Sequence, residues 1–178
     1  VSAVGMTGVG GWIQYLGGKT PGGNVYLSGR TLATGRRQGG RIDTTADNVT
    51  LAGATFDTSG TGANAKAGMQ RIGGGWQGKE ADISNAMRTL VTQTSTLNNL
   101  GQDGVVVVWS DDQTTYAAAL NASGSAVEVS GKENLSIDTA GIKAKSLLLD
   151  PKNIEIKNVS ATSGLNVQTI ANPNNTAG

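Results

Sequence analysis

Apolar residues of one kind recur at a nearly constant spacing in the C-terminal half of the chain. Val107, Val127 and Leu147 lie 20 positions apart, and further columns keep a step of 20 or 19: Trp109–Val129–Leu149, Tyr116–Leu135–Ile154 and Ala118–Ile137–Ile156. The columns that start at Val107 and Trp109 are two positions apart, as are those that start at Tyr116 and Ala118, and the residue between them is often polar. This is the period of a strand with one buried face. Each unit of about 20 residues is therefore expected to carry two short strands separated by turn-forming residues.

Strands at this spacing fit either an antiparallel sandwich or barrel, or a solenoid of stacked coils. Stacked coils place each residue above its equivalent in the next coil, about 4.8 Å away, and so favour columns of like side chains. The pattern predicts an all-β parallel β-helix (solenoid) over residues 22–158, with coils of about 20 residues. Residues 1–21 are expected to be irregular or capping, and 159–178 a tail or the start of the next coils.

Two stretches depart from the regular units. Extra residues at Gly73 to Met87 predict one longer insertion, and the sequence EADISNAMRTL in and after it suits a helical turn or a strand outside the coils. The run GVVVVW ends at Trp109. We expect Val107 and Trp109 to point inwards, and Val106 and Val108 to lie outwards under the insertion or another layer.

The composition excludes several classes of function. The chain has no Cys and no His, so thiolate and imidazole chemistry and the commonest zinc ligands are absent from its sequence. A formal net charge of +1 gives no sign of nucleic-acid binding. No apolar run approaches the roughly 18 residues of a membrane-spanning helix. Aromatic residues make up only 4% of the chain, which suits a narrow coil with little room for large rings.

Three ordered motifs resemble a recurring segment of large bacterial exoproteins. They are VVVWSD from Val106, VEVSGK from Val127, and LLLDP followed by NIEI from Leu147. In order and spacing they are similar to filamentous-haemagglutinin-like and high-molecular-weight adhesins of two-partner secretion systems. The resemblance implies a right-handed parallel β-helix, export by an outer-membrane transporter barrel, and a role in adhesion or as a rigid stalk. The tail also holds Asn172-Pro173-Asn174, similar to a motif of that family's export domain, which we interpret as a turn.

Carboxylates and tryptophans are the candidates for chemistry. β-Helices include polysaccharide-acting enzymes with clustered carboxylates, sometimes with calcium. Asp111 and Asp112 are adjacent, but neighbouring strand residues point to opposite faces, and Asp112 is expected to form a surface ion pair with Lys132. The Gly-rich stretches that end at Trp12 and Trp76 lack the Lys-Ser/Thr of a phosphate loop and are predicted to be turns. Either tryptophan could stack on a sugar, although packing is the favoured interpretation.

The sequence therefore predicts a non-catalytic structural or adhesive segment of a secreted or surface-displayed bacterial exoprotein. We expect no catalytic, cofactor-binding or metal-binding residues and no cofactor. The expected partners are a receptor or glycan on a host or neighbouring cell, contacted chiefly by the insertion, and the transporter barrel during export, with no nucleic acid. Two alternatives stay open: a polysaccharide-acting β-helix enzyme, and a self-assembling extracellular filament subunit that associates end to end.

Overall fold

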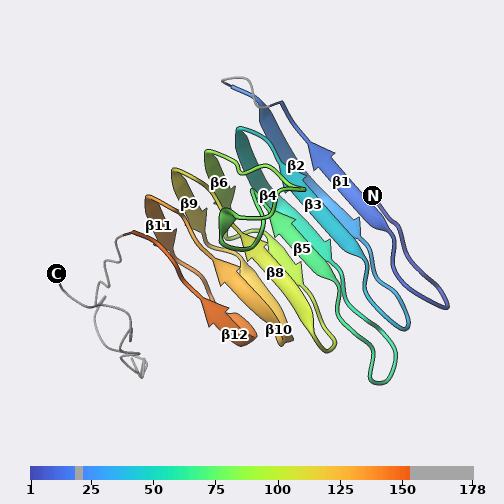
Figure 1. The fold of residues 1–178 in the computed structure, drawn as a ribbon. Coiled ribbons are helices and arrows are strands. Elements are labelled where there is room, and N and C mark those ends of the chain that lie inside the picture. The colour runs from blue at the N-terminus through green and yellow to red at the C-terminus, as the bar shows by residue number, and fades with distance from the viewer. Residues whose placement is uncertain (19–21, 153–178) are drawn as a thin grey trace.

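The chain winds into a parallel β-solenoid of about 5 turns, which confirms the predicted fold class. The computed structural model describes residues 1–18 and 22–152, and within them twelve strands join into one sheet whose strand pairs are all parallel (Figure 1). The strands are β1 (Trp12–Leu16), β2 (Asn24–Leu32), β3 (Arg41–Thr45), β4 (Asn48–Asp57), β5 (Met69–Ile72), β6 (Arg88–Val91), β7 (Thr96–Asn98), β8 (Gly104–Val108), β9 (Gln113–Tyr116), β10 (Ala119–Val129), β11 (Asn134–Ile137) and β12 (Ile142–Leu148).

The sheet has three faces, because several strands bend from one face to the next. The first face stacks β1, β3, β5, β8 and the second halves of β10 and β12. The second face stacks the first halves of β2 and β4 with β6, β9 and β11. The third face stacks the remaining halves of β2 and β4, β7, and the first halves of β10 and β12. Gly53, with a φ of 69°, lies at the bend of β4, in a conformation that favours glycine.

Columns of inward side chains form the core. On the second face, Leu51 pairs with Val91 and Val91 with Tyr116. On the third face, Phe56 pairs with Leu97 and Leu97 with Leu120. All six side chains are buried, so each turn covers the apolar surface of its neighbours.

The valine run lies one residue out of its predicted phase. Val106 pairs with Val127 and Val108 with Val129, and these four residues lie in the core. The prediction that Val107 and Trp109 point inwards, and Val106 and Val108 outwards, is therefore wrong. The step between these rungs is 21 residues rather than 20, and both sides of β8 are buried, so the apolar pattern carries no information on phase.

The second predicted column shows the same displacement. Tyr116 pairs with Ile137, not with Leu135, so the expected pairing of Ala118 with Ile137 is also wrong. Leu147 does lie on Val127, as predicted. Ile154 and Ile156 of these columns, and the predicted tail 159–178, lie outside the described residues.

The turns differ in length more than the predicted 20 residues allows. Along the first face the equivalent residues are Trp12, Arg41, Met69, Val105, Ala126 and Ser146, so successive turns contain 29, 28, 36, 21 and 20 residues. Only the last two turns have the predicted length, because the earlier ones carry loops. β1 pairs with β3, so the parallel ladder already begins within residues 1–21. Across residues 1–18 and 22–152 no helix has the length and hydropathy needed to cross a bilayer.

Candidate functional site: the insertion on the first face

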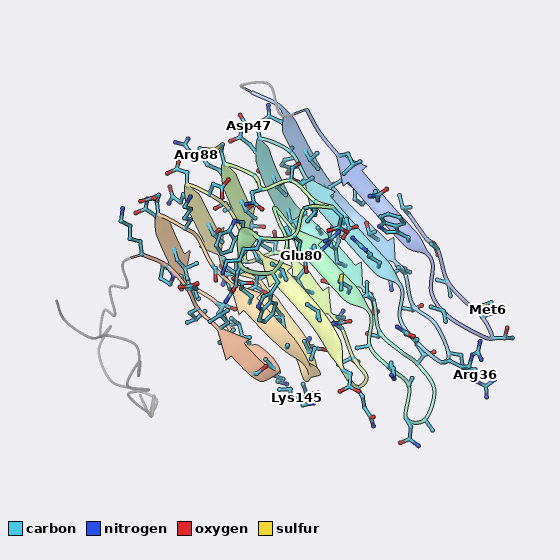
Figure 2. The ribbon with its side chains drawn as sticks, viewed as in Figure 1. Met6, Arg36, Asp47, Glu80, Arg88 and Lys145 are labelled. Atoms are coloured by element: carbon cyan, nitrogen blue, oxygen red, sulfur yellow. The ribbon has the colours of Figure 1, made fainter. Side chains whose placement is uncertain are left out.

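The predicted insertion, residues 73–87, lies across the outer side of the first face. It connects the end of β5 to the start of β6, with one short 3-10 turn at Trp76–Gly78. The residues after it, Arg88–Val91, form the regular strand β6 rather than a strand outside the coils. In Figure 1 the insertion is the green loop in front of the sheet, and Figure 2 labels its Glu80 near the middle of the molecule.

A buried arginine holds the middle of the insertion. Register places Arg71 of β5 directly opposite Asp43 of β3 on the outer side of the face, and Nε of Arg71 donates to Oδ1 of Asp43 at 2.8 Å. Its Nη1 donates to Oε2 of Glu80 at 2.6 Å and to Oδ1 of Asp82 at 2.7 Å. Arg71 is only 2% exposed, and a guanidinium at such a site requires carboxylate partners. The insertion supplies two of the three.

A second arginine and a tryptophan complete this charge cluster. Arg41 pairs with Asp43 and with Asp82, each at 2.7 Å. The Trp12 indole Nε1 donates to Oδ2 of Asp43 at 2.8 Å, and the Arg41 guanidinium lies 4.8 Å from the Trp12 ring centroid. Burial raises the pKa of the Asp43 carboxyl, while the Trp12 hydrogen bond and the Arg41 charge act in the opposite sense. Trp12, a sugar-stacking candidate, thus has one ring face against Arg41.

The other part of the insertion packs on Trp109 and Glu128. A Cβ added to Gly74 or Gly78 would come within 2.7 or 2.6 Å of the Trp109 ring, so the glycines allow the backbone to lie directly on the indole. Buried Glu128 of β10 accepts a hydrogen bond from the backbone N–H of Gln77 at 2.7 Å. Burial raises the pKa of the Glu128 carboxyl, and this hydrogen bond and one from Ser130 partly offset the effect. The insertion therefore contacts the rungs of β3, β5, β8 and β10.

The adjacent carboxylates do not converge. Oδ1 of Asp111 accepts from Asn85 Nδ2 at 3.1 Å, while Oδ2 of Asp112 pairs with Arg88 Nε at 3.0 Å. The predicted ion pair between Asp112 and Lys132 is wrong, because Asp112 lies against the preceding rung instead. Within the part of the chain that the structure describes, no three His, Cys, Asp or Glu side chains are grouped closely enough to hold a metal ion.

Glycine-rich stretches allow successive turns to approach closely. A Cβ on Gly10, Gly40 or Gly68 would lie 2.2, 2.1 or 2.0 Å from a backbone oxygen of a neighbouring segment. These glycines form part of the wall of a shallow hollow of about 340 Å³ beside Trp12. A second hollow, of about 470 Å³, lies between the loop that carries Arg36 and Arg37 and the neighbouring loop at residues 62–65, at the edge where Figure 2 labels Arg36.

The comparisons with known proteins include an informative match among solved structures. No family model matches the chain, and no curated protein matches it. Among solved structures, the HMW1 secretion domain from Haemophilus influenzae is 26% identical, with a TM-score of 0.57, over 79% of this chain and 43% of that domain. The chain thus spans less than half of the HMW1 domain's length. The shared solenoid and the sequence identity together confirm that this chain resembles the filamentous-haemagglutinin-like and high-molecular-weight adhesin exoproteins of two-partner secretion systems.

Proposed function

We propose that this chain is a non-catalytic, structural and adhesive segment of a bacterial exoprotein that is secreted or displayed on the cell surface. The observation that supports this most strongly is the match in sequence and fold to the HMW1 secretion domain. By this proposal, an outer-membrane transporter barrel recognises the chain and exports it before it folds.

The fold suits such export. Each rung pairs only with its neighbours, so a solenoid can fold turn by turn as it emerges from a pore. The chain has no Cys, so disulfides cannot lock it in a folded state before it crosses the membrane. The folded chain is stabilised instead by ladders of backbone hydrogen bonds and by buried aliphatic side chains.

Under this proposal the insertion is the surface that contacts a receptor or glycan on another cell. It covers the outer side of the first face, and the ion pairs of its Glu80 and Asp82 attach it to Arg71 and Arg41. Glu80 and Asp82 keep 36% and 59% of their side-chain surface exposed, so they are available to a partner. A pre-organised loop on a rigid scaffold binds with a smaller loss of conformational entropy than a mobile one.

Export is tested by giving the chain a periplasmic signal peptide and expressing it with or without its own two-partner transporter barrel. Barrel-dependent appearance of folded chain in the medium is the expected result. Equal amounts in the medium with and without the barrel would refute the export role.

Adhesion is tested with beads that carry the chain. Replacing residues 74–86 by a short Gly-Asn-Gly turn should abolish binding to cells, whereas the same replacement of loop residues 61–64 should not. Unchanged binding by a folded variant that lacks the insertion would refute its role. The enzyme alternative is tested separately by turnover of acidic polysaccharides with and without calcium; activity that is lost in Asp112→Ala would replace the non-catalytic proposal.

A further inference from the structure

Two adjacent arginines line the hollow of about 470 Å³ at the loop edge of the solenoid. Arg36 and Arg37 are both exposed, and among the residues that the structure describes neither guanidinium pairs with a carboxylate. The arginines on the strands differ in this respect, because Arg41 and Arg71 each bond two or more carboxylates. The two guanidiniums at the hollow therefore keep their N–H donors for water or a ligand.

The charge around this hollow has a single sign. Parallel bridges stack the loops within residues 1–11, 33–40 and 58–68 on one another. These three stretches contain three basic residues and none of the chain's 13 acidic residues. A hollow lined by charge of one sign concentrates ions of the opposite sign, so this edge attracts anions although the whole chain is almost neutral.

A turn in the third of these loops adds neutral donors. The backbone N–H of Ala65 donates to the carbonyl oxygen of Gly62 at 3.2 Å, which closes a turn with Ala63 and Asn64 at its centre. The φ of Asn64 is 57°. The central N–H groups of a turn have no partner within it, and neither of these two donates to another backbone oxygen of the described chain. Both residues line the hollow, as does Thr7 with its hydroxyl. Successive free N–H groups at a turn are a common arrangement for binding an anion.

Glycines allow the two arginines to lie against different neighbouring loops. A Cβ added to Gly62 would come within 3.3 Å of Cγ of Arg36, and one added to Gly8 would come within 3.5 Å of Nη2 of Arg37. The stem of Arg36 therefore lies beside the loop that follows it in the stack, and the guanidinium of Arg37 lies beside the loop that precedes it. Figure 2 shows Arg36 at the outer end of this edge, where a ligand reaches it from solvent.

We propose that this hollow binds the phosphate monoester group of a phosphorylated saccharide. Near neutral pH a phosphate monoester carries about −1.5 to −2 charges, which two arginines match, whereas a sulfate ester or a carboxylate carries a single charge. Its oxygens accept charge-assisted hydrogen bonds from Arg36 and Arg37 and further bonds from the turn amides. The residues that line the hollow are otherwise small or polar, which suits a sugar better than a lipid chain.

This proposal goes beyond the proposed function, because no residue that lines the hollow belongs to the insertion. It is tested by titrating the chain with glucose-6-phosphate and following the backbone amides by NMR. Saturable shifts at Ala63 and Asn64 are the expected result. Arg36→Gln and Arg37→Gln should each weaken binding about 10-fold or more, because each removes charge-assisted hydrogen bonds. The matched control is Arg30→Gln, which removes the same charge from an exposed position outside the hollow and should change the affinity less than about twofold.

The pH dependence separates phosphate from other anions. The second pKa of a phosphate monoester is about 6, so binding should weaken when the pH is lowered from about 7 to about 5. None of the residues that line the hollow titrates in this range, so the change reports the charge of the ligand. Glucose-6-sulfate should bind more weakly than glucose-6-phosphate at neutral pH, and its affinity should not change over this range.

Four outcomes would overturn the proposal. Absence of saturable shifts would show that the hollow has no anion site, and an equal loss in Arg30→Gln would show that only the overall charge matters. Equal affinity for glucose-6-sulfate would exclude a phosphate site, and tighter binding to phosphatidic acid vesicles would assign the hollow to a lipid headgroup. A variant in which a short turn replaces residues 74–86 should bind glucose-6-phosphate unchanged, so these outcomes leave the adhesive role of the insertion untouched.

Discussion

Arg71→Met is the sharpest test of how the insertion is held. The substitution keeps a long side chain that fills the same space but removes the charge that binds Asp43, Glu80 and Asp82. Glu80 and Asp82 are partly exposed and can turn to water. Asp43 is 1% exposed and cannot, so most of the cost comes from the carboxylate that stays behind.

The structure sets the size of the effect. Removing one partner of a buried ion pair costs about 3–5 kcal/mol, and Asp43 retains the Arg41 and Trp12 donors, so we expect about 3 kcal/mol. For a chain of this length that corresponds to a fall in Tm of about 6–12 °C. Guanidinium denaturation gives the free energy of unfolding, and faster amide exchange confined to residues 74–87 would show that the insertion is released first.

The matched control is Arg88→Met, which removes an ion pair to Asp112 from a side chain that is 68% exposed. Its expected cost is below about 1 kcal/mol. Adding Asp43→Asn to Arg71→Met should recover part of the loss, because it removes a buried carboxylate charge that has kept only one of its two arginine partners. If Arg71→Met cost no more than Arg88→Met, the charge cluster would not hold the insertion.

Three further predictions concern buried contacts, each measured by denaturant unfolding. Burial raises the pKa of the Glu128 carboxyl, so the folded chain binds this proton more tightly than the unfolded chain does. The free energy of unfolding therefore falls as pH rises from the unfolded pKa through the folded pKa. Glu128→Gln should thus gain stability relative to the native chain between pH 4 and pH 8; a loss would contradict this. Gly78→Ala should cost about 1–3 kcal/mol more than Gly53→Ala, which has a similar φ but open space around it, and equal costs would exclude the packing on Trp109. Asn99→Ala should cost about 2 kcal/mol more than Asn98→Ala, because buried Asn99 bonds Thr58, Gly68 and Ser125; equal losses would argue against that network.

The regular part of the fold was predictable because the last turns are nearly free of loops. There the 20-residue step and the two-residue alternation have a single cause, the stacking of strands in a ladder. The phase of Val107 was not predictable, because one side of β8 meets the core and the other meets the insertion, and an apolar side chain suits both. Because the step from β8 to β10 is 21 residues instead of 20, the residues expected on the inner side of β8 lie on its outer side, and the reverse.

The charge cluster was missed although its signal was present. Asp43 and Arg71 occupy the same position in the short strands RIDTT and MQRI, 28 residues apart, so stacking makes them neighbours. Recognising this requires the lengths of the loops between β3 and β5, which no apolar periodicity sets. The position of the insertion was predictable, but its partners were not, because they depend on that register.

The contacts of the insertion with several rungs determine how the solenoid is expected to unfold. In a simple repeat protein each turn is coupled only to its neighbours, so the array frays progressively from its ends. Here a single loop bonds to Arg41 on β3, Arg71 on β5 and Glu128 on β10, and it packs on Trp109, which follows β8. The insertion thereby couples the four rungs in the middle of the solenoid. Under mechanical force the outer turns should unfold first, and the coupled rungs should unfold later, in a single step.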